Sequence, residues 1–151
     1  MNCDVALNEV SQLVGLGVVL RDHLGQVLGS SRQRVPAGFS PAIAEATAIF
    51  RGLRFALDIG VTLSLVESDA SLAVGLINGS ADTSANIGLV ILDIKRCLFE
   101  FLNCQISFVP RAANFVAHRL VKFTLFSCEY DFLIDAVLPC MESLILTDLS
   151  G

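Results

Sequence analysis

Short apolar runs, rich in β-branched residues, fill the first third of the chain, and such runs are typical of strands. The tetrapeptide Asp22-His23-Leu24-Gly25 favours a turn between two of them. The pattern predicts three strands, at Cys3–Leu7, Val14–Arg21 and Gln26–Ser31. Because short connections join them in order, we expect a three-stranded antiparallel meander.

The pattern then changes to a helical period. Ser40 can cap a helix whose first position is Pro41, and Gly60 closes the run. Between them, apolar residues recur every three or four positions, at Ile43, Ala46, Ile49, Phe50, Leu53, Ala56 and Leu57. This segment is the clearest predicted helix of the chain.

The rest of the chain alternates strand and helix. Two more strands are predicted, at Val61–Val66 and Gln105–Val109. Asp69 comes just after the first of these and is placed to cap a helix through Ile77, which stops at Asn78-Gly79. Two further helices are predicted, one at Asn86–Leu102 and one from Ala113 to about Phe126.

This order of elements predicts an α/β fold with a five-stranded mixed sheet and helices on both faces. An active site is then expected at the carboxyl ends of the parallel strands. No repeat or linker interrupts the chain. We therefore predict one layered domain at residues 1–128, followed by an acidic tail at 129–151 that is extended or irregular, with at most a short helical turn.

Composition fits one globular domain and excludes disorder, with 54% hydrophobic and 17% charged residues. The longest stretch without a charged residue runs from Ala70 to Ala81, short of the roughly 18 apolar residues that a membrane span requires. The amino terminus carries Asp4 and Glu9 with no Lys or Arg before Arg21, unlike a secretory signal. These features predict an intracellular protein.

Net charge is −5, which by itself argues against a nucleic-acid partner. However, five acids and no basic residue follow Cys128, so residues 1–128 are charge-balanced. Acids that hold divalent cations would make the working surface more positive still. The five cysteines are widely spaced without a Cys-x-x-Cys motif, and we interpret all of them as structural rather than as a zinc site or disulfide framework.

Three carboxylates, Asp4, Glu45 and Asp69, lie in apolar surroundings. Buried acids are costly unless they are paired or bound to metal. If the first and fourth strands are neighbours, the three side chains can meet at one point, where hard oxygen ligands suit two Mg²⁺ or Mn²⁺ ions about 4 Å apart. The structural alternative is that Asp69 caps a helix, Glu45 favours a helix start and Asp4 lies exposed near a frayed end.

Five short motifs follow one another between residues 2 and 125. They are Asn2-Cys3-Asp4-Val5-Ala6; Gly17-Val18-Val19-Leu20-Arg21-Asp22 with Gly25; Ala44-Glu45-Ala46; Val66-Glu67-Ser68-Asp69; and Val109-Pro110-Arg111 with Asn114 and Val116-Ala117-His118. In this order they resemble the plant ribonuclease H-like family, the type 1, reverse-transcriptase-like branch of ribonuclease H. The resemblance implies the ribonuclease H-like fold and metal-dependent hydrolysis of the RNA strand of RNA–DNA hybrids.

The resemblance also implies site residues. The first three metal-binding acids of the family fall on Asp4, Glu45 and Asp69, and the fourth position falls on His118, a neutral ligand that suits Mn²⁺ better than Mg²⁺. Val5 stands where the family commonly has Gly. A position where Gly allows a close approach of the backbone must therefore accommodate a β-branched side chain. The alternative for His118 is a helix residue whose imidazole faces solvent.

Contacts to nucleic acid are predicted at Arg111, Arg119 and Asn114, with Lys122 a weaker candidate because its charge is typical of a solvated helix face. Two functions follow. The first is an endonuclease for RNA–DNA hybrids that uses Mg²⁺ or Mn²⁺. The second is a nucleic-acid-binding or interaction module whose catalysis has decayed, as Val5, His118 and the acidic balance would suggest.

Overall fold

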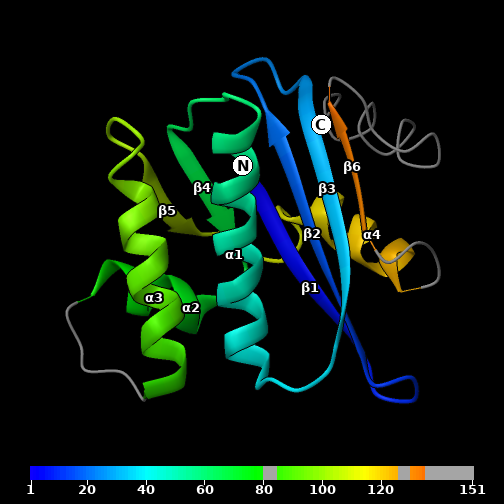
Figure 1. Ribbon diagram of the computed structural model, residues 1–151. Helices are drawn as coiled ribbons and strands as arrows, with labels where there is room; N and C mark the ends of the chain where they lie inside the picture. The colour runs from blue at the N-terminus through cyan, green and yellow to red at the C-terminus, as the bar shows by residue number, and fades with distance from the viewer. Residues whose placement is uncertain (80–84, 126–129, 135–151) are drawn as a thin grey trace.

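The computed structural model describes residues 1–79, 85–125 and 130–134. Within these ranges the chain forms a six-stranded mixed sheet and four helices (Figure 1). The strands are β1 (Asn2–Asn8), β2 (Leu13–Arg21), β3 (Val27–Pro36), β4 (Leu65–Ser68), β5 (Gln105–Phe108) and β6 (Tyr130–Ile134). The helices are α1 (Pro41–Asp58), α2 (Ser71–Asn78), α3 (Ala85–Leu98) and α4 (Phe115–Thr124).

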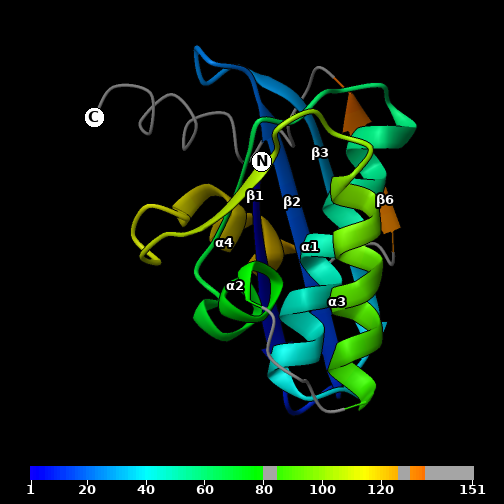
Figure 2. The ribbon, with the colours of Figure 1, turned by 90° about the vertical axis from the view of Figure 1, so that its left-hand side faces the viewer.

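The strand order is β5-β4-β1-β2-β3-β6. β1 pairs in parallel with β4, and β4 with β5, whereas the pairs β1–β2, β2–β3 and β3–β6 are antiparallel. Helices α1 and α3 lie side by side on one face of the sheet and α4 lies on the other (Figure 2). The predicted α/β fold with helices on both faces is confirmed.

Helix α1 forms as predicted and contributes many of the buried residues of the core. The Ser40 hydroxyl accepts a hydrogen bond from the backbone of Ile43 at 3.4 Å, Pro41 opens the helix, and Gly60 follows its end with φ +72°. Its inward positions are fully buried between the sheet and α3 and include Ala46, Ile49, Leu53 and Ala56. Because α1 is firmly packed, the side chains on its first turns start from a backbone that is held in place.

Two glycines let α4 lie directly on β2. A Cβ atom on Gly17 would come 2.5 Å from Val121 Cγ1, and one on Gly15 would come 3.0 Å from the Val121 carbonyl oxygen. Larger residues would hold the helix away from the sheet. The closely packed helix also contacts β1, the strand that carries Asp4.

The prediction of five strands was wrong, because the sheet of the described residues has a sixth strand. β6 pairs with β3, which is longer than predicted and would otherwise offer an unpaired edge. β6 belongs to the segment predicted as an acidic tail; residues 126–129 and 135–151 of the chain lie outside the described residues. Among the described residues, no helix is long and apolar enough to span a membrane.

Several predicted boundaries also shift. β4 begins at Leu65 rather than Val61, because the Val61 N–H still donates to Ala56 at the end of α1. Helix α3 ends at Leu98 rather than Leu102, where tighter turns take over and fold Phe101 back into the core. Helix α4 is shorter than predicted at both ends.

Candidate active site

The site lies where two parallel strands stop pairing. β4 runs beside β1 as far as the pair of Cys3 with Ser68 and then ends, while β1 continues. Asp4 is the next residue on β1, and Asp69 is the next residue after β4. On its other side Asp4 pairs with Gly17 of β2, which has no side chain to cover it. The sheet therefore brings together two acids that are 65 positions apart in the sequence.

Helix α1 adds the third carboxylate. Glu45, in its second turn, faces the same depression as the two aspartates. The depression is lined by Cys3, Asp4, Val5, Glu45, Ala48, Ser68 and Asp69. The three acids singled out in the sequence thus lie around one place on the surface.

The three carboxylates influence one another. Burial raises the pKa of Asp4, which is 8% exposed, and the charge of Asp69 raises it further, whereas hydrogen bonds from Val5 and His118 lower it. Burial also raises the pKa of Glu45, and the charges of Asp69 and Asp4 add to this. Crowded negative charge of this kind favours a bound cation.

Helix α4 places His118 against Asp4, and the turn before α4 places Arg111 against His118. His118 Nδ1 lies 2.7 Å from Asp4 Oδ2, and Arg111 Nη2 lies 3.0 Å from Nδ1 and 3.2 Å from Nε2 of the same ring. A ring with its proton on Nδ1 donates to Asp4 and leaves Nε2 as an acceptor for the guanidinium. His118 does not face solvent, since its side chain is 12% exposed.

Asn114 has a different place from the one predicted. Its side chain is 1% exposed, and Nδ2 donates to the Cys3 carbonyl at 2.7 Å and to Asp69 Oδ1 at 2.9 Å. Because it is buried, it is not available for the predicted contact with nucleic acid, and it fixes Asp69 beside β1 instead. Its Oδ1 is buried and has no hydrogen-bond partner among the described residues.

The expectation that Asp69 caps α2 was also wrong. Ala70 is the residue before this helix, and no side chain caps the helix. The Ser68 hydroxyl accepts from the Ala70 N–H at 3.2 Å, while the carboxylate of Asp69 turns toward Asn114. This leaves Asp69 for the site.

The donor chemistry of the depression fits a hard divalent cation. Carboxylate oxygens are the ligands that Mg²⁺ and Mn²⁺ prefer, and burial raises the pKa of the Cys3 thiol to about 12, so Cys3 brings no thiolate. Within residues 1–79, 85–125 and 130–134, no group of three or more His, Cys, Asp or Glu side chains is arranged to hold a metal ion. As placed, the three carboxylates line one depression but are not arranged as a ready-made ion site.

The other residues predicted to contact nucleic acid are exposed, and they come from α4 and the turn before it. Arg111 is in the turn before α4, and Arg119 and Lys122 follow on the exposed face of that helix. The Arg119 guanidinium lies 5.0 Å from the centre of the Phe115 ring. These cations remain predicted phosphate contacts.

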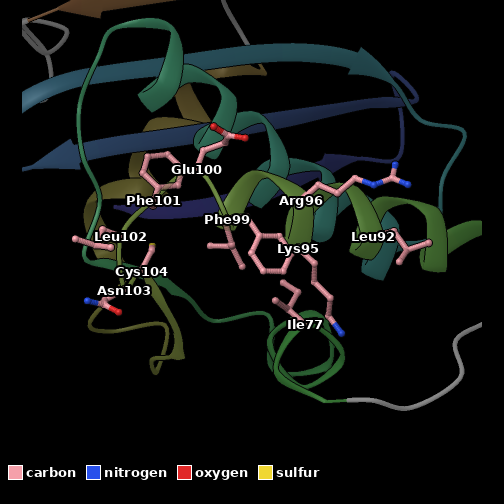
Figure 3. A pocket seen from close by; sticks show the side chains of 11 residues that line it. Ile77, Leu92, Lys95, Arg96, Phe99, Glu100, Phe101, Leu102, Asn103 and Cys104 are labelled. Atoms are coloured by element: carbon pink, nitrogen blue, oxygen red, sulfur yellow. The ribbon is translucent and has the colours of Figure 1, made fainter.

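A larger cavity of about 730 Å³ opens elsewhere, beside α3 and the turn that follows it (Figure 3). Its lining is mainly apolar and includes Leu92, Phe99, Phe101 and Leu102. It shares no lining residue with the acidic depression. We place the candidate chemistry at the depression, because it holds the convergent carboxylates.

Comparison with solved structures defines the class of fold. The N-terminal RNase H domain of Rv2228c from Mycobacterium tuberculosis, solved as a fusion with maltose-binding protein, is 24% identical over 83% of this chain and 91% of that chain, with a TM-score of 0.73. RNase H1 from the halophilic archaeon Halobacterium salinarum NRC-1 is 23% identical over 83% and 96%, with a TM-score of 0.72.

LC11-RNase H1, isolated from compost by a metagenomic approach and solved in complex with an RNA/DNA hybrid, is 22% identical over 82% of this chain and 94% of that chain, with a TM-score of 0.72. At these identities the likeness establishes the fold, which is that of ribonuclease H. Residues 2–124 match the model of the reverse transcriptase-like family, and the chain belongs to this family. A search of the curated proteins gives no match.

Proposed function

We propose that this chain is an endonuclease of the ribonuclease H type, which hydrolyses the RNA strand of RNA–DNA hybrids with Mg²⁺ or Mn²⁺ as cofactor. The observation that carries the proposal is the meeting of Asp4, Glu45 and Asp69 at one depression beside the end of β4. The hybrid bound to the structurally similar LC11-RNase H1 supports the choice of substrate. Membership of the plant branch of the family, indicated by the motifs, is part of the same proposal.

Asp4, Glu45 and Asp69 are the residues that would hold divalent cations at this site. Such cations would polarise the scissile phosphodiester and lower the pKa of water. Asn114 orients Asp69 through its 2.9 Å hydrogen bond, and His118 orients Asp4 through its 2.7 Å contact. Both partners come from one side of the sheet, so the closely packed α4 sets the position of two of the three acids.

Glu45 has a second role in the proposal. It approaches from α1 and lines the same depression as Asp4 and Asp69. In the proposal it helps to hold one ion and also positions the attacking water. Arg111 and Arg119 would fix the register of the hybrid by contacting phosphates, which carry no sequence information.

The test is a hybrid with a labelled RNA strand, incubated with Mg²⁺ and, separately, with Mn²⁺. We expect the RNA strand to be cut, with Mn²⁺ more effective because an imidazole stands beside the carboxylates. Asp69→Asn should abolish cutting, whereas Asp58→Asn should not, because Asp58 forms an exposed pair with Arg54 at 3.5 Å far from the depression.

One observation favours a second function. His118 already engages Asp4, and Arg111 contacts the same imidazole ring, so the depression could serve to bind a hybrid without cutting it. Retention of the labelled hybrid, with an intact RNA strand in both metals, would establish this binding module and overturn the endonuclease. Cutting that survives in Asp69→Asn would point to a contaminating nuclease and would also remove support for the proposal.

A further inference from the structure

A second face of the molecule exposes large apolar side chains. Phe99 is 89% exposed and Leu102 is 83% exposed, both in the turns that follow α3. Leu89 and Leu92, one turn apart on α3 itself, are exposed as well. Single exposed apolar side chains are ordinary on a protein surface, whereas four on one helix and its following turns indicate a surface that binds a partner. We call these four residues the α3 face.

The turns hold Phe99 and Leu102 in place. The N–H groups of residues 99, 100 and 101 each donate to the carbonyl three positions earlier, at 3.1 or 3.2 Å. Phe101 turns inward and is buried, so the chain between the two exposed side chains is anchored in the core. Side chains on an ordered backbone lose little conformational entropy on binding, and they therefore suit the central positions of an interface.

The larger cavity lies beside these two side chains. It has a volume of about 730 Å³, and its apolar lining includes Ile77, Leu92, Leu98, Phe99 and Leu102 (Figure 3). Cavities of roughly 300–1,000 Å³ accommodate ligands of drug size, so this one has room for an aromatic and an aliphatic side chain of another molecule. A small ligand inside it would leave much of Phe99 and Leu102 in water, whereas a protein surface would cover both and fill the cavity.

The charges around the cavity favour a partner of the same kind. Two basic and two acidic residues lie on α3 and at its end, so this face has no net charge: Lys95, Arg96, Asp93 and Glu100. Arg96 pairs with Asp93 at 3.2 Å, and Lys95 Nζ donates to the Gly79 carbonyl at 2.8 Å. A strongly acidic or strongly basic partner would be attracted by one pair and repelled by the other. A second copy of the chain carries both signs and can match both.

We propose that the α3 face is the contact surface of a homodimer, in which Phe99 and Leu102 of each copy enter the cavity of the other. In a twofold contact each copy offers the same patch to its partner, so projecting side chains and the hole that receives them must lie on one face. Both lie side by side here. The dimer does not depend on the proposed nuclease activity, because this cavity shares no lining residue with the acidic depression.

The experiment measures the mass of the full chain by sedimentation and light scattering, from low to high micromolar concentration. We expect the mass to rise to twice the 16.2 kDa of one chain and to stop there. Phe99→Asp removes an anchor twice in each dimer and puts a charge in its place, so the dissociation constant should rise roughly 100-fold or more. Val10→Asp is the matched control: Val10 is 98% exposed in the turn between β1 and β2, and its variant should dimerise like the wild type. Because both changes are at exposed positions, neither should lower Tm.

The apolar dye anilinonaphthalene sulfonate reports on the same face. The amount of dye bound per chain should fall as the wild-type protein dimerises and covers its cavity. Wild-type protein that keeps the mass of one chain, a dimer that Phe99→Asp does not weaken, or assemblies that grow beyond two copies would each overturn the homodimer. A chain that stays monomeric and binds the dye at every concentration, but loses it in Phe99→Asp, would instead have an open site for a small apolar ligand.

Discussion

Ionised Glu45 lowers the stability of the fold, and this has a measurable consequence. Burial and the charges of Asp69 and Asp4 raise its pKa, so the folded chain binds this proton more tightly than the unfolded chain. The stability that the protonated group contributes is complete below the unfolded pKa and is lost as the pH rises through the raised folded pKa. Asp4, whose pKa is also raised, acts with the same sign.

We therefore expect Glu45→Gln to match the wild type in acid and to be the more stable protein at neutral pH. Urea unfolding at a series of pH values between about 4 and 8 measures the free energy of unfolding of both. Glu100→Gln, an exposed change on the turn after α3, is the control. A variant that is less stable than the wild type at neutral pH would show that Glu45 gains more from its surroundings than it loses by burial.

At the scale of single residues, the sequence singled out three acids that line one depression in the structure, but it did not indicate what holds them. Asp69 and Asn114 each stand just before a helix, where short polar side chains usually cap. Neither caps, because a buried amide N–H without a partner costs more than an absent cap, and the Asn114 amide donates to Asp69 across 45 positions instead. Such a partnership depends on packing, so no local pattern could predict it.

At the scale of elements, α4 governs the site because glycines allow it to pack closely on β2. In Gly17→Ala, the new Cβ would come 2.5 Å from Val121 Cγ1 and 3.3 Å from the Val121 backbone nitrogen. The helix must move outward, taking His118 away from Asp4. We expect a loss of about 1–3 kcal/mol in the free energy of unfolding, measured by urea titration.

Gly38→Ala is the matched control, because a Cβ there would have nothing within 4 Å. Val121→Ala combined with Gly17→Ala removes the clashing methyl groups and should recover part of the lost stability. Equal stability of Gly17→Ala and Gly38→Ala would show that α4 accommodates a side chain at this position without cost. The pair of glycines would then not set the height of the helix above the sheet.

Elements with local signals were predicted well, and elements fixed by their partners were not. Ser40 and Pro41 define α1 within the chain itself, and the structure confirms its start. β4 begins several residues later than predicted, because its start is set by the pairing of Leu65 with Gln105 of β5 rather than by its own apolar run. The ends of a strand depend on its neighbours, which a linear pattern does not identify.

At the scale of the whole molecule, β6 bears on the predicted boundary between the domain and its tail. The division into a domain at 1–128 and a tail at 129–151 cuts just before this strand. β6 pairs with β3 from Gln33–Tyr130 to Gly29–Ile134, and the Phe132 ring lies 6.5 Å from that of Phe55 on α1. The segment therefore contributes to the sheet and to packing against a core helix.

A chain ending at residue 128 leaves the outer edge of β3 unpaired and should be the less stable protein by at least about 1 kcal/mol, or several degrees in Tm. An exposed edge strand also favours association, so light scattering should detect assemblies. A chain ending at residue 134 keeps β6 and is the matched comparison. If the two truncated chains have the same Tm and associate to the same extent, the domain ends at 128 and β6 adds nothing to stability. If only the longer one matches the full chain, the domain extends through β6 and the acidic tail begins after it.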